Sequence, residues 1–331
     1  MIASFAIQQA EVSNVSPVWW VATLAWFVVL LFIDLRVQSK VRSSLRLAVI
    51  RSAVWISLGI LLGVFIWIGL GATARDLYFS GYLIEKMLSV DNIFVWSIIL
   101  AYLQIPKDLQ SKVLSWGIIG AIFFRSVFVF AGIALISLFE PILLVLGVLL
   151  MYTAIKLFRD NGTASYDPGK SRISKFARAV LPLSDKLYGA KLITKLNGKT
   201  VVTRLSLAII VLELTDVLFA IDSVPAVLAI VRDPYIVLAS NIAAVLGLRA
   251  LYFIFEELAS QVRYLNKGLG IILFVVGFSL LLEPDKIFGF NWIALEFPPG
   301  FSLIFIAIVL TITIALSIIA SKKDTSNASS K

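Results

Sequence analysis

Residues 213–225, ELTDVLFAIDSVP, place three carboxylates and a proline inside an apolar run. The residues LSLAIIVL precede this stretch and AVLAIV follow it, so the whole segment is long and hydrophobic enough to cross a bilayer as a helix. An ionised side chain near the centre of such a helix costs about 3 kcal/mol to insert. Glu213, Asp216 and Asp222 are therefore expected to be compensated inside a helix bundle and to serve a function there.

The composition predicts an all-α membrane protein. Hydrophobic residues make up 60% of the 331 residues and charged residues 15%, which is more apolar surface than a soluble core of this length buries. Apolar windows of spanning length recur along the whole chain. The nine expected transmembrane helices are 18–35, 52–71, 82–103, 113–138, 141–158, 205–231, 235–255, 265–282 and 301–320.

The basic residues predict how the protein lies in the membrane. The net charge of +9 is concentrated in alternate loops, which follows the positive-inside rule and does not indicate a nucleic-acid partner. Residues 156–204 carry eleven Lys or Arg against three Asp, and residues 36–51 and the C-terminal tail are also basic. These segments are expected in the cytoplasm, with the N-terminus outside and the C-terminus inside. Residues 18–35 follow no basic signal-peptide region and are expected to remain as a membrane helix.

An internal repeat explains why acids occur in two separate spans. YLIEKMLSVDNIFVW (82–96) can be overlaid on LELTDVLFAIDSVPAV (212–227), and residues 117–130 on residues 241–254. Each copy holds three spans, so consecutive copies run in opposite directions, and the substrate site of such inverted-repeat transporters lies between the halves. The matched polar pairs are Glu85 with Asp216, Asp91 with Asp222, Asn92 with Ser223 and Arg125 with Arg249.

The repeat divides the chain into five parts. They are two N-terminal transmembrane helices (1–80), a first three-helix repeat (81–158), a basic cytoplasmic loop (159–204), a second three-helix repeat (205–283) and a C-terminal transmembrane helix with its tail (284–331).

The residue types predict a site for a hard divalent cation. Cys and His are absent from the chain, so any metal must be held by oxygen. Carboxylates, Asn92 and Ser223 supply side-chain oxygens, and Pro225 is expected to bend its helix beside Asp222 and to free the Ile221 carbonyl. Such a set suits Mn²⁺, Ca²⁺ or Mg²⁺. The alternative is two structural acid–arginine pairs that lock the halves together, although buried ion pairs stabilise proteins poorly.

The stretches GYLIEKMLSVDNIFVW, WGIIGAIFFR, LLMYTAIKLF and LELTDVLFAIDSVPAV together resemble the TerC family of bacterial and plastid membrane proteins, over residues 48–282. The resemblance implies a protein of manganese homeostasis, chiefly a Mn²⁺ exporter, with relatives named for tellurite resistance and others tied to metal loading of secreted enzymes. It places the family's membrane carboxylates on Glu85, Asp91, Asp216 and Asp222. Asp34 is a further candidate, or else a partner of the nearby Arg36.

The expected function is Mn²⁺ export from the cytoplasm, with Ca²⁺ as the alternative ion and no nucleotide. Asp91 and Asp222 are the expected central ligands, helped by Glu85, Asp216, Asn92, Ser223, Glu213 and Asp34, and Arg125 and Arg249 are expected counter-charges that control gating. A bound carboxylate must lose its proton, so Mn²⁺ and H⁺ are expected to compete, which favours proton-coupled export and leaves a uniporter open.

Three alternatives remain open on the sequence alone. One is a membrane scaffold that supplies metal to exported proteins; another is a tellurite or other oxyanion carrier that uses the two arginines. An enzyme is the third and is not expected, because no nucleophile with a base and no phosphate-binding loop is present. The expected partners are membrane lipid and a divalent cation, with a second copy of the chain or the secretion machinery left open. The expected location is the bacterial cytoplasmic membrane or a thylakoid or other plastid membrane.

Overall fold

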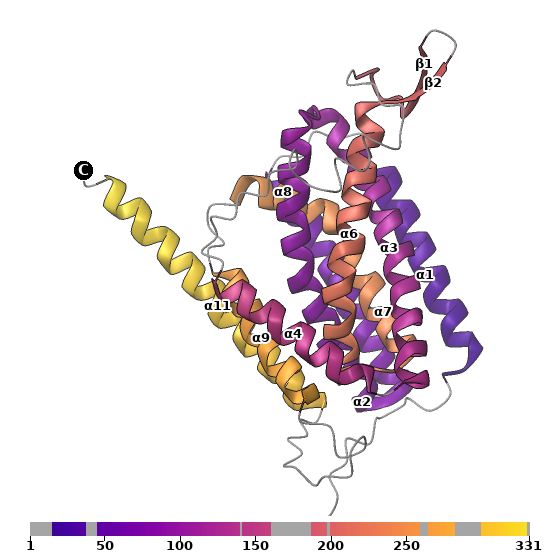
Figure 1. Ribbon diagram of the computed structural model, residues 1–331, viewed down its shortest axis with the longest axis vertical. Coiled ribbons are helices and arrows are strands. Elements are labelled where there is room, and N and C mark those ends of the chain that lie inside the picture. The colour runs from indigo at the N-terminus through magenta and orange to yellow at the C-terminus, as the bar shows by residue number, and fades with distance from the viewer. Residues whose placement is uncertain are drawn as a thin grey trace, which may run out of the picture.

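The computed structural model of the protein is a helix bundle and describes residues 15–37, 45–139, 141–159, 187–196, 199–258, 264–281 and 299–329. Figure 1 shows α4, α9 and α11 inclined to the upright part of the bundle. The helices are α1 (Pro17–Val37), α2 (Leu45–Tyr102), α3 (Lys107–Leu138), α4 (Ile142–Arg159), α6 (Arg204–Leu228), α7 (Pro234–Val245), α8 (Leu248–Leu258), α9 (Leu265–Leu281) and α11 (Pro299–Ser329).

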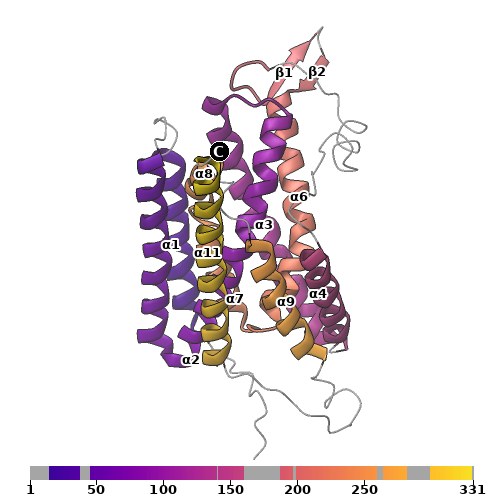
Figure 2. The same ribbon diagram turned by 90° about the vertical axis from the view of Figure 1, so that its left-hand side faces the viewer.

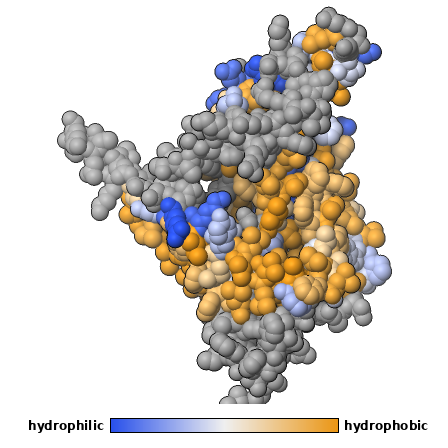
Figure 3. Space-filling view, viewed as in Figure 1, coloured by the Kyte–Doolittle hydropathy of each residue, from blue (hydrophilic) through white to orange (hydrophobic). Residues whose placement is uncertain are grey.

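Hydrophobicity and helix length confirm a mostly helical membrane protein. Among the described residues, four helices are long and apolar enough to span a membrane, or five if the bent pair α7 and α8 is counted as one span. Figure 3 shows hydrophobic side chains over the body of the bundle, as a lipid-facing surface requires. Nine spans therefore remain a prediction, although the helices at the N-terminus and at residues 107–159, 204–228 and 265–281 lie close to the expected windows.

The long helix α2 is two antiparallel arms joined at Gly71. Gly71 has φ 90° and ψ −179°, a conformation that glycine adopts without steric cost. The Tyr78 hydroxyl donates to the Gly59 carbonyl over 2.8 Å, and a Cβ atom at Gly63 would lie 2.4 Å from the Phe79 ring. These contacts across Gly71 show that α2 folds back on itself, so the two separate spans expected at 52–71 and 82–103 are joined by a glycine and not by a loop.

The span expected at 235–255 is broken. α7 ends at Val245 and α8 begins at Leu248, with a bend of 42° between them. Gly247 has a φ of 85° at the break, and a Cβ atom there would lie 2.5 Å from Cβ of Trp55. Glycine thus provides both the left-handed backbone and the close packing against the first arm of α2. α6, by contrast, stays helical through Pro225 and ends at Leu228.

The contacts between helices are those expected if the two predicted three-helix repeats are related by a two-fold axis. The second arm of α2, α3 and α4 correspond to α6, the α7–α8 pair and α9 in the predicted repeat. α2 packs on α7 and α8, and α3 packs on α6, so each of these contacts becomes the other when the two repeats are interchanged. α4 packs on α9, its counterpart in the other repeat, so this contact is unchanged by the interchange. The pattern supports the inverted repeat, which stays a prediction.

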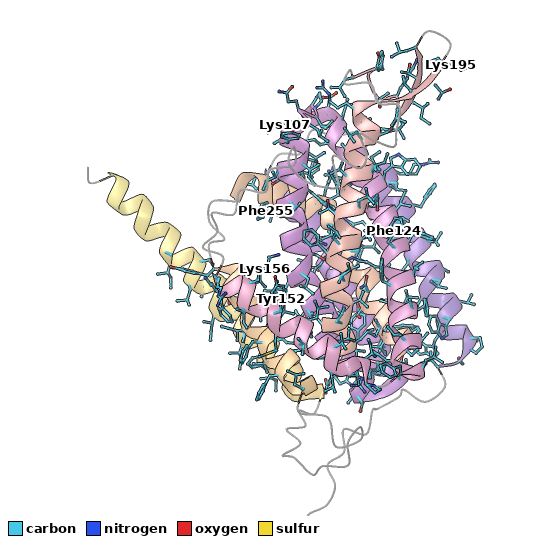
Figure 4. All side chains as sticks on the ribbon, in the orientation of Figure 1. Lys107, Phe124, Tyr152, Lys156, Lys195 and Phe255 are labelled. Carbon is cyan, nitrogen blue, oxygen red and sulfur yellow. The ribbon has the colours of Figure 1, made fainter. Side chains whose placement is uncertain are left out.

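One element departs from the expected all-α fold. Strands β1 (Ile193–Leu196) and β2 (Lys199–Val202) form an antiparallel hairpin just before α6, within the predicted cytoplasmic loop. Figure 2 shows this hairpin at one end of the molecule, with the turn of α2 at the other end. Lys107 and Lys195 lie at the hairpin end, while Phe124 and Tyr152 lie along the bundle (Figure 4). The hairpin end is thus the basic end expected in the cytoplasm.

The orientation predicts which end reacts with an external label. The chain has no cysteine, so one introduced thiol gives an unambiguous signal. Thr73→Cys, exposed beside the turn of α2, is expected to react with a membrane-impermeant maleimide in intact cells, whereas Lys195→Cys on β1 should react only after permeabilisation. Labelling of Lys195→Cys in intact cells would contradict the orientation.

Candidate cation site

Arg125 of α3 joins an acid from each half of the bundle. Its Nη1 donates to Oε2 of Glu85 on α2, and its Nε lies 3.3 Å from Oδ2 of Asp216 on α6. The side chains are fully buried, with exposures of 0% for Glu85 and 1% for Arg125 and Asp216. We call these three residues the central acid cluster. Its formal charge is −1, because two carboxylates surround one guanidinium.

Two amides bind the same carboxylates. Nδ2 of Asn92 donates to Oδ1 of Asp216 over 3.0 Å, and Nδ2 of Asn241 donates to Oε1 of Glu85 over 2.7 Å. Each acid therefore accepts one hydrogen bond from Arg125 and one from an amide of the other half of the bundle. Such an arrangement fixes both carboxylates and turns the side-chain carbonyl oxygens of the amides toward other positions.

Local sequence explains how these groups meet. Glu85, Ser89 and Asn92 are spaced four and three residues apart, so they lie on one face of the second arm of α2. The arm approaches α7 closely because Gly81 faces Ser240; a Cβ atom at position 81 would lie 2.7 Å from Oγ of Ser240. The small residue at position 81 is therefore what brings Glu85 within reach of Asn241.

Several buried polar atoms on the helices that form the cluster lack a hydrogen-bond partner among the described residues. They include Oγ of Ser89, Oγ of Ser223 and Nη2 of Arg125. An unpaired polar atom away from water is unfavourable by about 1–3 kcal/mol, so each position invites water or a ligand. Ser89 and Ser223 lie in α2 and α6, the two helices that carry the acids, and Ser223 is one of the predicted ligands.

The two expected central ligands lie on these same helices. Asp91 belongs to α2 and Asp222 to α6, but their side chains fall outside the described ones. Among the side chains that are described, no group of three or more Asp, Glu, His or Cys residues is placed to hold a metal ion. A site built on Asp91 and Asp222 thus remains a prediction.

Glu213 lies against α3, not within the central acid cluster. A Cβ atom at Gly120 would come within 2.0 Å of its Oε2, so the carboxylate occupies the space that the glycine leaves. This oxygen is buried and accepts no hydrogen bond from the described residues. Glu213 is thus close to the α3–α6 contact but is not held by Arg125.

Arg249 does not take the place that its match with Arg125 suggests. Its Nη2 lies 2.9 Å from Oδ2 of Asp34 on α1 and also donates to the Asp34 carbonyl, while its Nη1 donates to Ser115 of α3. Asp34 is thus a partner of Arg249, and its pairing with Arg36 stays a prediction. The break at Gly247 starts a new helix before Arg249, which provides a physical reason for the different position of its side chain.

Sequence reasoning misses two residues beside the cluster. Asn241 lies at the start of the segment overlaid on residues 117–130, where its counterpart is Gly117, so the overlay gives no signal. Lys86 follows Glu85 directly and is a charged residue in an apolar span, which is a usable signal. Asn241 belongs to α7 and donates to Glu85 of α2, and Lys86 of α2 donates to carbonyls at the end of α7, so both lie in the contact between the same two helices as Glu85.

Comparison with known proteins identifies the chain's relatives. The model of the integral membrane protein TerC family matches residues 70–325. The chain is 35% identical over 320 residues to a candidate membrane-bound redox modulator, Alx, of Photorhabdus laumondii, covering 93% of this chain and 96% of that protein. It is 35% identical over 309 residues to an uncharacterised membrane protein of Myxococcus xanthus, covering 93% and 94% of the two chains.

A third relative is the candidate membrane-bound redox modulator Alx of Escherichia coli K12, which is 35% identical over 278 residues, or 81% of this chain and 86% of that one. No solved structure matches the chain. Both the family model and the relatives cover most of the sequence, and their description as membrane proteins agrees with the apolar helices. The chain belongs to the TerC family of integral membrane proteins.

Proposed function

We propose that the protein exports Mn²⁺ from the cytoplasm through a site between its two halves, coupled to inward movement of protons. The observation that supports this most directly is the central acid cluster, because it brings buried carboxylates from α2 and α6 to one arginine. Acids at membrane depth are typical of ion pathways and proton relays. Asp91 and Asp222, further along the same helices, are proposed as the metal ligands.

The charge of the cluster favours a cation over an oxyanion. Arg125 is bound by two carboxylates and Arg249 by Asp34, so both arginines already have acidic partners. An oxyanion would have to displace these carboxylates, whereas a cation meets a cluster whose formal charge is −1. The oxyanion alternative is therefore the weaker one.

Arg125 provides the counter-charge for the state without metal. Two carboxylates buried this deeply would repel each other strongly if no cation lay between them. A divalent ion that approaches the acids offers them a second cation, so Arg125 and the metal compete for the same negative charge. The arginine can thereby couple loading of the site to a change in the contact between the halves.

Oxygen chemistry and family membership together support Mn²⁺. The chain offers carboxylate, amide, hydroxyl and main-chain oxygens but no thiolate or imidazole, which suits hard cations and not Zn²⁺ or Cu⁺. The redox role in the names of two relatives would need a group other than a thiol in these 331 residues. A change in the cellular Mn²⁺ level is one route by which a metal exporter would influence redox balance.

Ion-resolved flux through the purified protein tests the proposal. Proteoliposomes are loaded in parallel with Mn²⁺, Ca²⁺, Mg²⁺ or tellurite, and flux is followed with and without a pH gradient. Mn²⁺ flux well above that of empty liposomes and accelerated by the gradient is expected. Tellurite flux without Mn²⁺ flux would support the oxyanion carrier, and no flux of any ion would favour a metal-supplying scaffold.

A further inference from the structure

The break between α7 and α8 exposes carbonyl oxygens inside the bundle, and a lysine binds them. The last four carbonyls of any helix have no partner within it. α7 ends at Val245, and Nζ of Lys86 donates to the carbonyl of Ala244 over 2.7 Å and to that of Leu246 over 3.2 Å. The side-chain amine of a lysine from the second arm of α2 thus occupies the C-terminal end of α7.

The surroundings of this amine are those of a cation site. Carbonyl oxygens at a helix C-terminus carry the negative end of the helix dipole, which attracts cations. The ring of Tyr82 adds a π-face whose centroid lies 5.7 Å from Nζ of Lys86. Carbonyl oxygens of unwound helices hold Na⁺ and H⁺ in other transporters with discontinuous helices. The contacts to Lys86 are to neutral oxygens and a ring, which suits a monovalent ion better than a divalent one.

The site belongs to one half of the bundle only. In the overlay of residues 117–130 on 241–254, Gly247 corresponds to Phe123, and α3 continues as a helix through that residue. No carbonyls are released at that point of α3. Glu85, the neighbour of Lys86, is bound by Asn241 of the same α7, so one turn of α2 connects the central acid cluster to the broken helix.

We propose that the C-terminal end of α7 is a binding site for a small monovalent cation such as K⁺ or NH₄⁺, and that the Lys86 ammonium fills it as a tethered ligand in this conformation. Where the Lys86 ammonium is missing, a free cation from solution takes its place and keeps the break between α7 and α8 intact. This site is separate from the proposed Mn²⁺ ligands and does not depend on Mn²⁺ export.

Removal of the ammonium tests the site. The Lys86→Met side chain reaches as far as Cε, the atom that carries Nζ in lysine. It therefore leaves a gap the size of an ammonium ion. The unfolding temperature of purified protein is measured in chloride salts of NH₄⁺, K⁺ and Na⁺ against choline chloride at equal ionic strength. The variant is expected to unfold several degrees below wild type in choline, and NH₄⁺ or K⁺ should reverse most of that loss in a saturable way. Wild type should respond equally to all the salts.

Two further variants make the result decisive. Lys112→Ala removes another lysine whose Nζ donates to a carbonyl, that of Ala190 over 2.6 Å, but at an exposed position, and it should show no recovery specific to one cation. Lys86→Arg keeps a cation and should need no added ion. If Lys86→Met is destabilised equally in every salt, Lys86 is an ordinary helix cap and no cation site exists. Because the readout is folding of the purified protein, this outcome would leave the proposed Mn²⁺ export untouched.

Discussion

Asp222→Asn and Asp91→Asn are each expected to abolish Mn²⁺ efflux while the protein still reaches the membrane. Asparagine keeps the size of the side chain and one oxygen but removes the negative charge that compensates for dehydration of the ion. Loss of a partner outside the first coordination shell already costs about 10–100-fold in metal affinity, so the loss of a charged ligand should be at least that large. Efflux is measured as the decay of Mn²⁺ in loaded cells, with membrane levels of each variant quantified in parallel.

Asp108→Asn is the matched control for these substitutions. Asp108 is exposed in the first turn of α3, where its charge stabilises the helix by about 0.3–1 kcal/mol. It lies on the surface and contacts no buried site among the described residues. Efflux by this variant should stay close to wild type. Folded Asp91→Asn and Asp222→Asn proteins that clear Mn²⁺ at the normal rate would remove both acids from the site, and the acids would then be structural.

The sequence predicts which charged residues lie buried in the bundle better than it predicts their partners. Glu85, Asp216 and Arg125 stand out because charged residues are rare in apolar spans, and the structure brings these three together. The pairing of Arg249 with Asp34 was not predicted, because it joins α8 to a helix outside the repeat. Charge and periodicity identify the side of a helix, whereas the choice of partner depends on how the helices pack.

Breaks in the helices were the least predictable part of the fold. Gly71 and Gly247 both turn the chain through positive φ values, yet Gly81 and Gly120 lie within regular helices and provide close packing instead. A single sequence does not distinguish these two uses of glycine, since both follow from the missing Cβ atom. Pro225 lies inside α6, which continues to Leu228, so the bend expected beside Asp222 stays a prediction.

Arg125→Ala is expected to destabilise the protein strongly and to abolish transport. The substitution leaves Glu85 and Asp216 buried without their cation, and removing one partner of a buried ion pair typically costs about 3–5 kcal/mol. Arg125→Lys should lose less stability and less transport, because it keeps the positive charge. It should still fall below wild type, because a single ammonium does not reproduce the planar guanidinium that binds one acid through Nε and the other through Nη1. Thermal unfolding in detergent is the measurement, and the unfolding temperature is expected to fall in the order wild type, Arg125→Lys, Arg125→Ala.

A second substitution separates loss of charge balance from loss of packing. In the double variant Arg125→Ala with Glu85→Gln, one carboxylate remains in place of two, so much of the stability lost in Arg125→Ala should return, although transport should not. Arg75→Ala is the control for removal of an arginine from an ion pair: Arg75 lies 2.7 Å from Asp76 at a partly exposed position, where such pairs are worth about 0–1 kcal/mol. A double variant no more stable than Arg125→Ala would show that Arg125 supports the bundle by packing alone. Arg125→Ala and Arg125→Lys proteins that both express and export Mn²⁺ like wild type would disprove the counter-charge role, because the two acids would then need no cation between them.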